Sequence, residues 1–148
     1  YVNIILVDNV YMEGKWKFMK VLSLKEPFAT LIMDKDKMIE TRSFKTNYRG
    51  ELYIHASLGK VDIKERSDLL QLVGKRNMHN GYIICKCRLV DCVYMSSAFV
   101  EDMKKNNYKE YICGEYKEGR YAWLLSDIQA LDEFIPAKGK LGIWNYNN

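Results

Sequence analysis

Apolar side chains occur along the chain in short runs separated by polar segments, and these runs have two different spacings. Runs with alternating or β-branched apolar residues predict β-strands. They cover residues 20–24, 38–44, 51–56, 81–94, 121–125 and 141–146. Residues 4–7 give a further, weaker strand signal, and the Asn-Tyr-Arg-Gly segment at 47–50 predicts a turn.

Other segments have the apolar spacing of helices. The first helix is predicted over about residues 27–34, with a proline at its start. Its apolar positions are Phe28, Leu31 and Ile32. A second helix is predicted over about residues 62–73, with Gly74 placed to end it. Its buried face is expected to consist of Ile63, Leu69, Leu70 and Val73. Weaker helical content over residues 97–111, with many polar residues, predicts an exposed segment.

Five to seven strands with two or three helices, and only two prolines, describe an α+β domain that closes on a small β-barrel. A length of 148 residues suits one domain with its own core. Residues 1–18 differ from the rest, because Met19 begins a segment that reads as a natural N-terminus. We interpret residues 1–18 as an N-terminal extension or an extra edge strand, and residues 19–148 as the domain.

The composition is that of an ordinary globular protein and restricts function only weakly. The formal net charge of +4 permits an anionic partner without requiring one. Aromatic residues make up 13% of the chain, and they can fill a core or stack on bases. No segment approaches the roughly 20 apolar residues that span a bilayer. We therefore expect no membrane partner, a cytoplasmic location and reduced cysteines.

The cysteines and histidines do not have the spacing of a metal site, because there is no Cys-x-x-Cys pair. These residues are Cys85, Cys87, Cys92, Cys113, His55 and His79. No motif places an activating partner beside a cysteine, and none predicts a cofactor. His55 ends an apolar strand, so we expect a hydrogen-bonded core histidine there.

Several blocks of sequence resemble the ASCH domain family. Residues 22–29, Leu-Ser-Leu-Lys-Glu-Pro-Phe-Ala, resemble the family's opening strand and proline-initiated helix. Residues 35–42, Lys-Asp-Lys-Met-Ile-Glu-Thr-Arg, are similar to its Gly-x-Lys-x-x-Glu-x-Arg signature. Further similar blocks follow in the family's order at residues 43–50, 54–57, 81–84, 89–92, 121–123 and 136–144. Lys35 replaces the signature glycine, so we expect the loop before Lys37 to differ in shape.

The resemblance covers about residues 19–146 and implies a PUA-like β-barrel with a cleft beside the first helix. It also implies a role in RNA metabolism, although family members differ in activity. They include a transcription-coactivator component, proposed RNA binders, amidohydrolases that act on acetylated cytidine, and reported ribonucleases. Three functions therefore stay open: binding of RNA or a modified nucleoside, which we favour, hydrolysis of such a ligand, or interaction with a protein.

The signature residues are the leading candidates for a functional site. Glu40 and Arg42 are two apart on a predicted strand and share one face, either as a surface ion pair or as ligand contacts. A charged Lys37 would contact phosphate, whereas a neutral one would act as base or nucleophile. In the amidohydrolase members, as the resemblance implies, this lysine acts with a threonine three residues later. Glu40 takes that threonine's position, and a carboxylate keeps the lysine charged, which argues against deacetylation.

The other candidates each have a structural alternative. Ser23 lies close to the opening of the first helix, where backbone N–H groups favour an anion. Arg49 forms a basic lip or an exposed turn, and Lys138 contacts an anion or solvent. Trp123 offers a stacking face or fills the core. The predicted ligand-binding residues are therefore Ser23, Lys37, Glu40, Arg42, Arg49, Trp123 and Lys138. If the protein is an enzyme, Lys37 and Glu40 are the expected acid and base.

Overall fold

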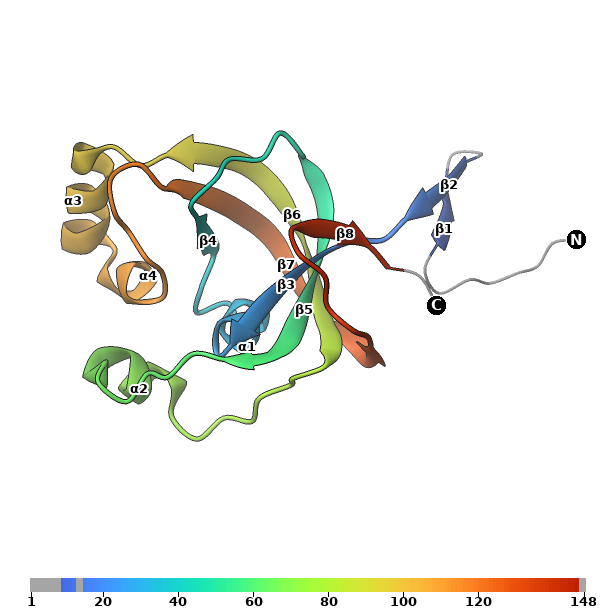
Figure 1. Ribbon diagram of the computed structural model, residues 1–148, viewed down its shortest axis with the longest axis horizontal. Coiled ribbons are helices and arrows are strands. Elements are labelled where there is room, and N and C mark those ends of the chain that lie inside the picture. Colours follow the sequence, from blue (N-terminus) through green and yellow to red (C-terminus); the bar gives the residue numbers. More distant parts are fainter. Residues whose placement is uncertain (1–8, 13–14, 147–148) are drawn as a thin grey trace, which may run out of the picture.

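The computed structural model describes residues 9–12 and 15–146, and within them the chain forms strands and four helices (Figure 1). The strands are β1 (Asn9–Met12), β2 (Lys15–Phe18), β3 (Lys20–Glu26), β4 (Ile39–Arg42), β5 (Gly50–Lys60), β6 (Tyr82–Tyr94), β7 (Tyr121–Pro136) and β8 (Ile143–Asn145). The helices are α1 (Phe28–Met33), α2 (Ser67–Val73), α3 (Ser97–Asn106) and α4 (Tyr108–Ile112). None of these helices is long and apolar enough to cross a membrane.

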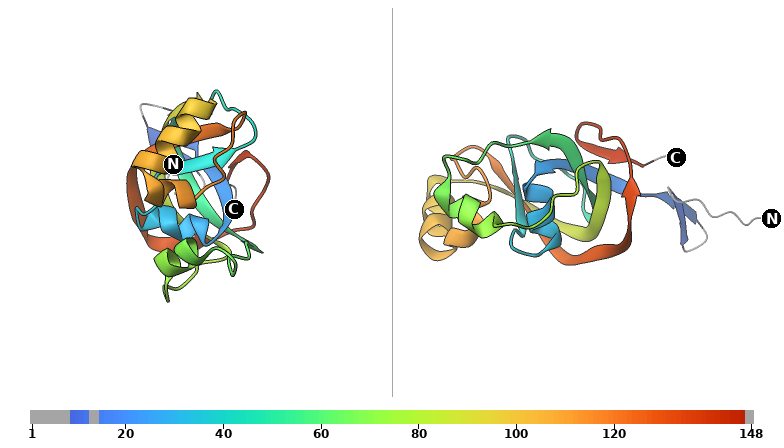
Figure 2. Two further views of the ribbon diagram at one scale, coloured as in Figure 1. Left: turned by 90° about the vertical axis from the view of Figure 1, so that its left-hand side faces the viewer. Right: turned by 90° about the horizontal axis from the view of Figure 1, so that it is seen from below.

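Six strands form one mixed sheet in the order β4-β7-β6-β5-β3-β8. β3 and β5 run parallel, and the other neighbours are antiparallel. The sheet curves around α1, which contacts β3, β5, β6 and β7 (Figures 1 and 2). The predicted α+β class is confirmed, with more helices than expected.

The prediction that the sheet closes into a barrel is wrong. β4 and β8 are the two edges of the sheet, and each is hydrogen-bonded to only one neighbour among the described residues. β4 has four residues and β8 has three, and these edges do not pair with each other in the described part of the chain, so the sheet stays open. β1 and β2 pair with each other in a separate sheet, and the assignment of residues 1–18 as an extension stays a prediction.

β5 and β7 are much longer than the sequence predicts. The β6–β7 ladder shifts register at three places, so the alternation of inward and outward side chains is interrupted. At each shift the two strands contribute unequal numbers of residues, which bends the pair and hides its period of two in the sequence. The long β6–β7 pair thereby curves around the core (Figure 2).

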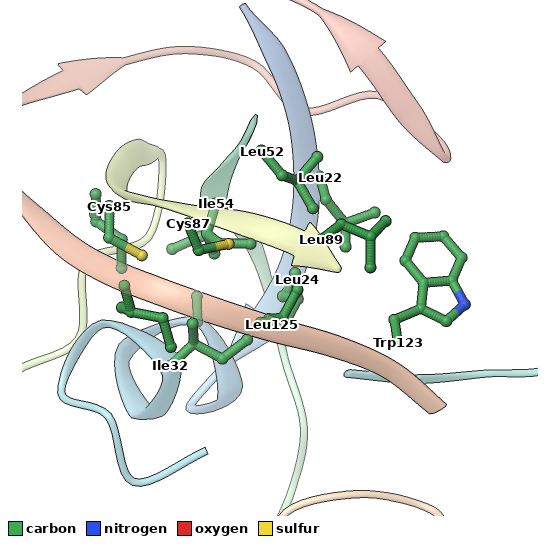
Figure 3. Close-up of a cluster of buried hydrophobic side chains, with 14 residues drawn as sticks. Leu22, Leu24, Ile32, Leu52, Ile54, Cys85, Cys87, Leu89, Trp123 and Leu125 are labelled. Carbon is green, nitrogen blue, oxygen red and sulfur yellow. The ribbon is translucent and has the colours of Figure 1, made fainter. Parts of the chain in front are cut away.

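The main core lies between the concave face of the sheet and α1 (Figure 3). It contains side chains of four neighbouring strands and of the helix, among them Leu22, Leu24, Ile32, Leu52, Ile54, Cys85, Cys87, Leu89, Trp123 and Leu125. Burial of such apolar side chains contributes roughly 1.5–3 kcal/mol each. This core fixes β3 and α1, whose ends carry several of the predicted site residues.

The second predicted helix is shorter than expected. α2 begins at Ser67, because Asp62 forms a separate turn by accepting a hydrogen bond from the backbone N–H of Lys64. Leu69 and Val73 are buried as predicted, but Leu70 is 48% exposed and its expected burial is wrong. A helix of seven residues presents only a narrow apolar stripe to the core, and Leu70 lies outside that stripe.

Candidate functional site

A cleft of about 1160 Å³ lies beside α1. It lies between β3, β4, the segment 113–115 and the loop 137–142 that leads to β8. Two carboxylates, Glu40 and Glu115, line it. The basic side chains that line it are Lys25, Lys37, Arg42, Arg66, Arg120, Lys138 and Lys140. The net charge of these lining side chains is higher than the formal net charge of the whole chain, which is +4. The positive charge of the chain is therefore concentrated around the cleft.

The turn after α1 directs Lys37 into the floor of this cleft. The backbone N–H groups of Asp36 and Lys37 both donate to the carbonyl of Leu31, at 2.9 and 3.1 Å. Lys35 takes a left-handed conformation with φ of 67°, although a lysine stands where the family signature has glycine. The tight turn is therefore made without glycine, at a cost in backbone strain.

Lys37 is 1% exposed and is held by two oxygen atoms. Its Nζ donates to the carbonyl oxygen of Cys113 at 2.6 Å and lies 3.5 Å from Oε1 of Glu40. The same Nζ lies 5.4 Å from the ring centroid of Phe28. Both contacts are to hydrogen-bond acceptor oxygens, and they hold Nζ in place at the floor of the cleft.

Glu40 and Arg42 point to one face of β4, as their spacing predicts. Arg42 Nε donates to Glu40 Oε2 at 2.9 Å, and Arg42 Nη2 donates to the carbonyl of Ser23 at 3.1 Å. One carboxylate thus lies between two cations, Lys37 and Arg42. The floor of the cleft is a polar, hydrogen-bonding surface with one net positive charge.

Glu110 of α4 positions the start of β4, a role that no motif in the sequence predicts. Its carboxylate is buried and accepts hydrogen bonds from the backbone N–H groups of Met38 and Ile39, at 2.8 and 3.1 Å. Burial raises the pKa of Glu110, whereas these backbone hydrogen bonds and the charge of Lys37 lower it. Through Glu110, α4 fixes the backbone that carries Lys37 into the cleft.

Ser23 belongs to a hydrogen-bonded chain behind the cleft wall. Nε2 of His55 lies 2.8 Å from the carbonyl of Ala137, which can only accept, so this nitrogen carries the proton. Nδ1 then accepts from the Ser23 hydroxyl at 2.9 Å, and Trp144 Nε1 donates to the same hydroxyl at 3.0 Å. Burial lowers the pKa of His55, and the hydrogen bond to Ala137 opposes this shift. His55 is therefore a buried, hydrogen-bonded histidine, as expected.

This chain ties the loop 137–142 to the sheet at close range. A Cβ atom at Gly139 would lie 2.7 Å from Ser23 Oγ and 2.9 Å from His55 Cε1. Glycine at this position lets the loop pass directly over the Ser23–His55 pair. Lys138 is exposed on that loop and faces the cleft, where it was predicted.

Two of the predicted site residues lie outside the cleft. Arg49 donates to the carbonyls of Thr46 and Tyr48, at 2.9 and 2.8 Å, within its own turn. Trp123 is 1% exposed in the main core, and its Nε1 donates to the carbonyl of Phe44 at 3.2 Å. The other five predicted residues, Ser23, Lys37, Glu40, Arg42 and Lys138, come together in the cleft lining.

The sequence analysis did not predict the residues that form the far wall of the cleft. Arg120 donates from Nε to the carbonyl of Glu115 at 2.9 Å and from Nη2 to that of Thr41 at 3.3 Å. Arg66 donates to the carbonyl of Ile112 at 2.8 Å. No motif marks either arginine, because each reaches the cleft through a contact between distant segments.

Cysteine chemistry has little support in this cleft. Cys113 is the cysteine that lines it, and burial raises the pKa of its thiol to about 11. The thiol is therefore protonated at neutral pH and is a poor nucleophile. Among the described residues, no three histidine, cysteine, aspartate or glutamate side chains are grouped to hold a metal ion.

A family model described as the ASCH domain matches residues 22–134 of the chain. The matched region includes Ser23, Lys37, Glu40 and Arg42, whereas the loop with Lys138 lies beyond it. No curated protein matches the chain at a significant level.

Proposed function

The chain belongs to the ASCH domain family, and from this premise we propose that its cleft binds RNA or a nucleotide in RNA metabolism. The observation that carries the proposal is the concentration of basic side chains around the cleft, whose lining has a higher net charge than the whole chain. Phosphate groups bind to such surfaces because lysine and arginine release counterions from the nucleic acid. In the same proposal, the open curved sheet is an incomplete PUA-like barrel that holds this cleft.

The distribution of charge in the cleft suggests how a nucleotide lies in it. Lys25, Lys138 and Lys140 are exposed, and none of them forms an ion pair within 4.0 Å in the described part of the chain. These three lysines can therefore contact phosphate. On the floor, Glu40 accepts and Arg42 donates hydrogen bonds, which suits the polar edge of a base. We propose that the phosphate faces the lysines and the base faces the floor.

Binding of labelled single-stranded RNA, measured by fluorescence anisotropy over a salt series, tests this proposal. The double variant Lys138→Ala/Lys140→Ala should weaken binding and make it less dependent on salt, by about 0.7 in the log–log slope for each lost phosphate contact. The matched control is Lys104→Ala/Lys105→Ala, which removes two exposed lysines of α3 outside the cleft. Equal losses in both double variants, or no binding by the wild type, would refute the cleft as the site.

A second candidate function, hydrolysis of an acetylated nucleoside or of RNA, is favoured by one observation. Lys37 and Glu40 lie side by side on the floor of the cleft, where a reacting group would be desolvated. Against it, Nζ of Lys37 is already engaged by the carbonyl of Cys113 and by Glu40. Turnover of N4-acetylcytidine and RNA that disappears in both Lys37→Ala and Glu40→Ala would establish catalysis.

A further inference from the structure

A second hollow of about 400 Å³ adjoins the basic cleft. We call it the tyrosine hollow, because Tyr108, Tyr111 and Tyr116 line it together with the start of α2. Arg66, Gly114 and Glu115 line both hollows, so the two adjoin at these residues. α2 and α4, which border the tyrosine hollow, lie at the same end of the molecule (Figure 1).

The tyrosines of this hollow belong to a column of stacked rings. Phe99 stacks on Tyr116, Tyr116 on Tyr111, and Tyr111 on Tyr108, with ring centroids 6.4, 5.7 and 6.1 Å apart. The interplanar angles of these pairs are 23°, 25° and 24°. The inner rings pack against a buried cluster, whereas Tyr108 is 49% exposed at the end of the column.

Tyr108 is fixed at both ends. Its ring rests on Tyr111, and its hydroxyl donates to Asp68 Oδ2 of α2 at 2.6 Å. An exposed aromatic ring held in this way loses little conformational entropy when a base stacks on it. Neither α4 nor α2 needs this exposed ring for its own core contacts, since Leu69, Val73 and Glu110 make the buried contacts.

The charges of the tyrosine hollow differ from those of the cleft. Its lining holds two carboxylates, Asp68 and Glu115, and one cation, Arg66. Arg120 lies 3.8 Å from Glu115 on the cleft side. A phosphate is therefore unfavourable inside the tyrosine hollow but favourable at the junction, beside Arg66 and Arg120. An uncharged base that carries amino donors suits the interior.

We propose that the tyrosine hollow binds a second base of a single-stranded RNA, stacked on Tyr108, with the linking phosphate at Arg66. The natural ligand is then an RNA of two or more nucleotides, and a free nucleoside uses the cleft alone. This inference rests on the proposed function of the cleft. A paired duplex does not satisfy the site, because a paired base does not expose its face for stacking.

The test compares a 5′-mononucleotide with a single-stranded hexanucleotide by isothermal titration. Tyr108→Leu should weaken hexanucleotide binding by about ten-fold or more and leave mononucleotide binding unchanged. Tyr108→Trp keeps a stacking face and should retain hexanucleotide binding. The matched control is Tyr94→Leu, which removes a ring that is 52% exposed on β6 and lines neither hollow.

The outcomes separate this inference from the function on which it rests. If Tyr108→Leu binds the hexanucleotide as the wild type does, while Lys138→Ala/Lys140→Ala does not, the second base site is refuted and the cleft is still supported as a binding site. Equal affinity of the wild type for mononucleotide and hexanucleotide also overturns the second site. If the wild type binds neither ligand, the proposed function itself fails. Loss of binding in Tyr108→Leu together with recovery in Tyr108→Trp supports the inference even where the leucine variant is less stable.

Discussion

Replacement of Lys37 by methionine tests the buried charges on which the cleft floor depends. Methionine has a similar length and fills the space beside Phe28 without a charge. The change removes the hydrogen bond to the Cys113 carbonyl at 2.6 Å and the contact to Glu40 at 3.5 Å. Glu40 keeps its second partner, because Arg42 Nε still donates to it at 2.9 Å.

The expected loss of stability follows from these contacts. Two unit charges 3.5 Å apart attract by about 5 kcal/mol at an effective dielectric constant of roughly 20. Burial of the ammonium costs several kcal/mol, so these two contributions nearly cancel when both are removed. The unpaired carbonyl of Cys113 then dominates, at about 1–3 kcal/mol. We expect Lys37→Met to lower the free energy of unfolding by about 2 kcal/mol, which at this size lowers Tm by roughly 4–8 °C.

Glu40→Gln should be more damaging, because it leaves the Lys37 ammonium buried beside one neutral carbonyl. Removal of one partner of a buried pair costs about 3–5 kcal/mol. Urea unfolding followed by tryptophan fluorescence measures both variants, and the double variant Lys37→Met/Glu40→Gln should lose less than the sum of the single losses. If the losses are additive, or if Lys37→Met is the more damaging single change, the assignment of Lys37 as a charged partner of Glu40 is refuted.

Three further predictions use other parts of the cleft. Lys35→Gly should raise the free energy of unfolding by about 1 kcal/mol, measured as a higher urea midpoint at unchanged m, since a lysine at φ of 67° is strained; a lower midpoint would contradict this. Gly139→Ala should lower Tm and weaken RNA binding in anisotropy assays, because its Cβ would meet Ser23 Oγ; wild-type behaviour would show that the loop is not constrained. Stability should fall as pH drops below about 6.5, since the lowered pKa of His55 means that the unfolded chain binds more protons there. Urea midpoints at different pH values should show a smaller fall in His55→Asn.

The sequence predicted those parts of the site whose geometry is determined by residues close together in the chain. Glu40 and Arg42 share a face because a strand has a period of two, and β4 keeps that period over its four residues. The turn after α1 is held by local hydrogen bonds to the carbonyl of Leu31, although the distant Glu110 and Cys113 also hold Lys37 in place. Ser23 was predicted close to the opening of the first helix; in the structure it lines the cleft, and its hydroxyl is hydrogen-bonded to His55 and Trp144.

The parts that the sequence did not predict depend on contacts between distant segments. The strand pattern around Trp123 allowed either a stacking face or a core ring, and only the packing of the sheet against α1 shows that the ring is buried. The sequence did not predict the full length of β7, because register shifts interrupt the alternation of its inward and outward side chains. Tyr108 lay in a segment that looks like a solvated helix, because neither its stacking on Tyr111 nor its bond to Asp68 leaves a mark in the sequence.

The cleft and the tyrosine hollow share one arrangement of charge, and this connects the two proposals. In the cleft, Glu40 lies on the floor while exposed lysines surround the mouth. In the tyrosine hollow, Asp68 lies beside the exposed ring while Arg66 lies at the junction. In each hollow a carboxylate can accept hydrogen bonds from base amino groups, while the exposed lysines at the cleft mouth and Arg66 at the junction attract phosphate. Each hollow therefore suits a base inside and a phosphate outside. Single-stranded RNA has uncharged bases joined through charged phosphates, and this order matches the two hollows and the cations between and around them. The arrangement therefore supports single-stranded RNA over a free anion as the ligand.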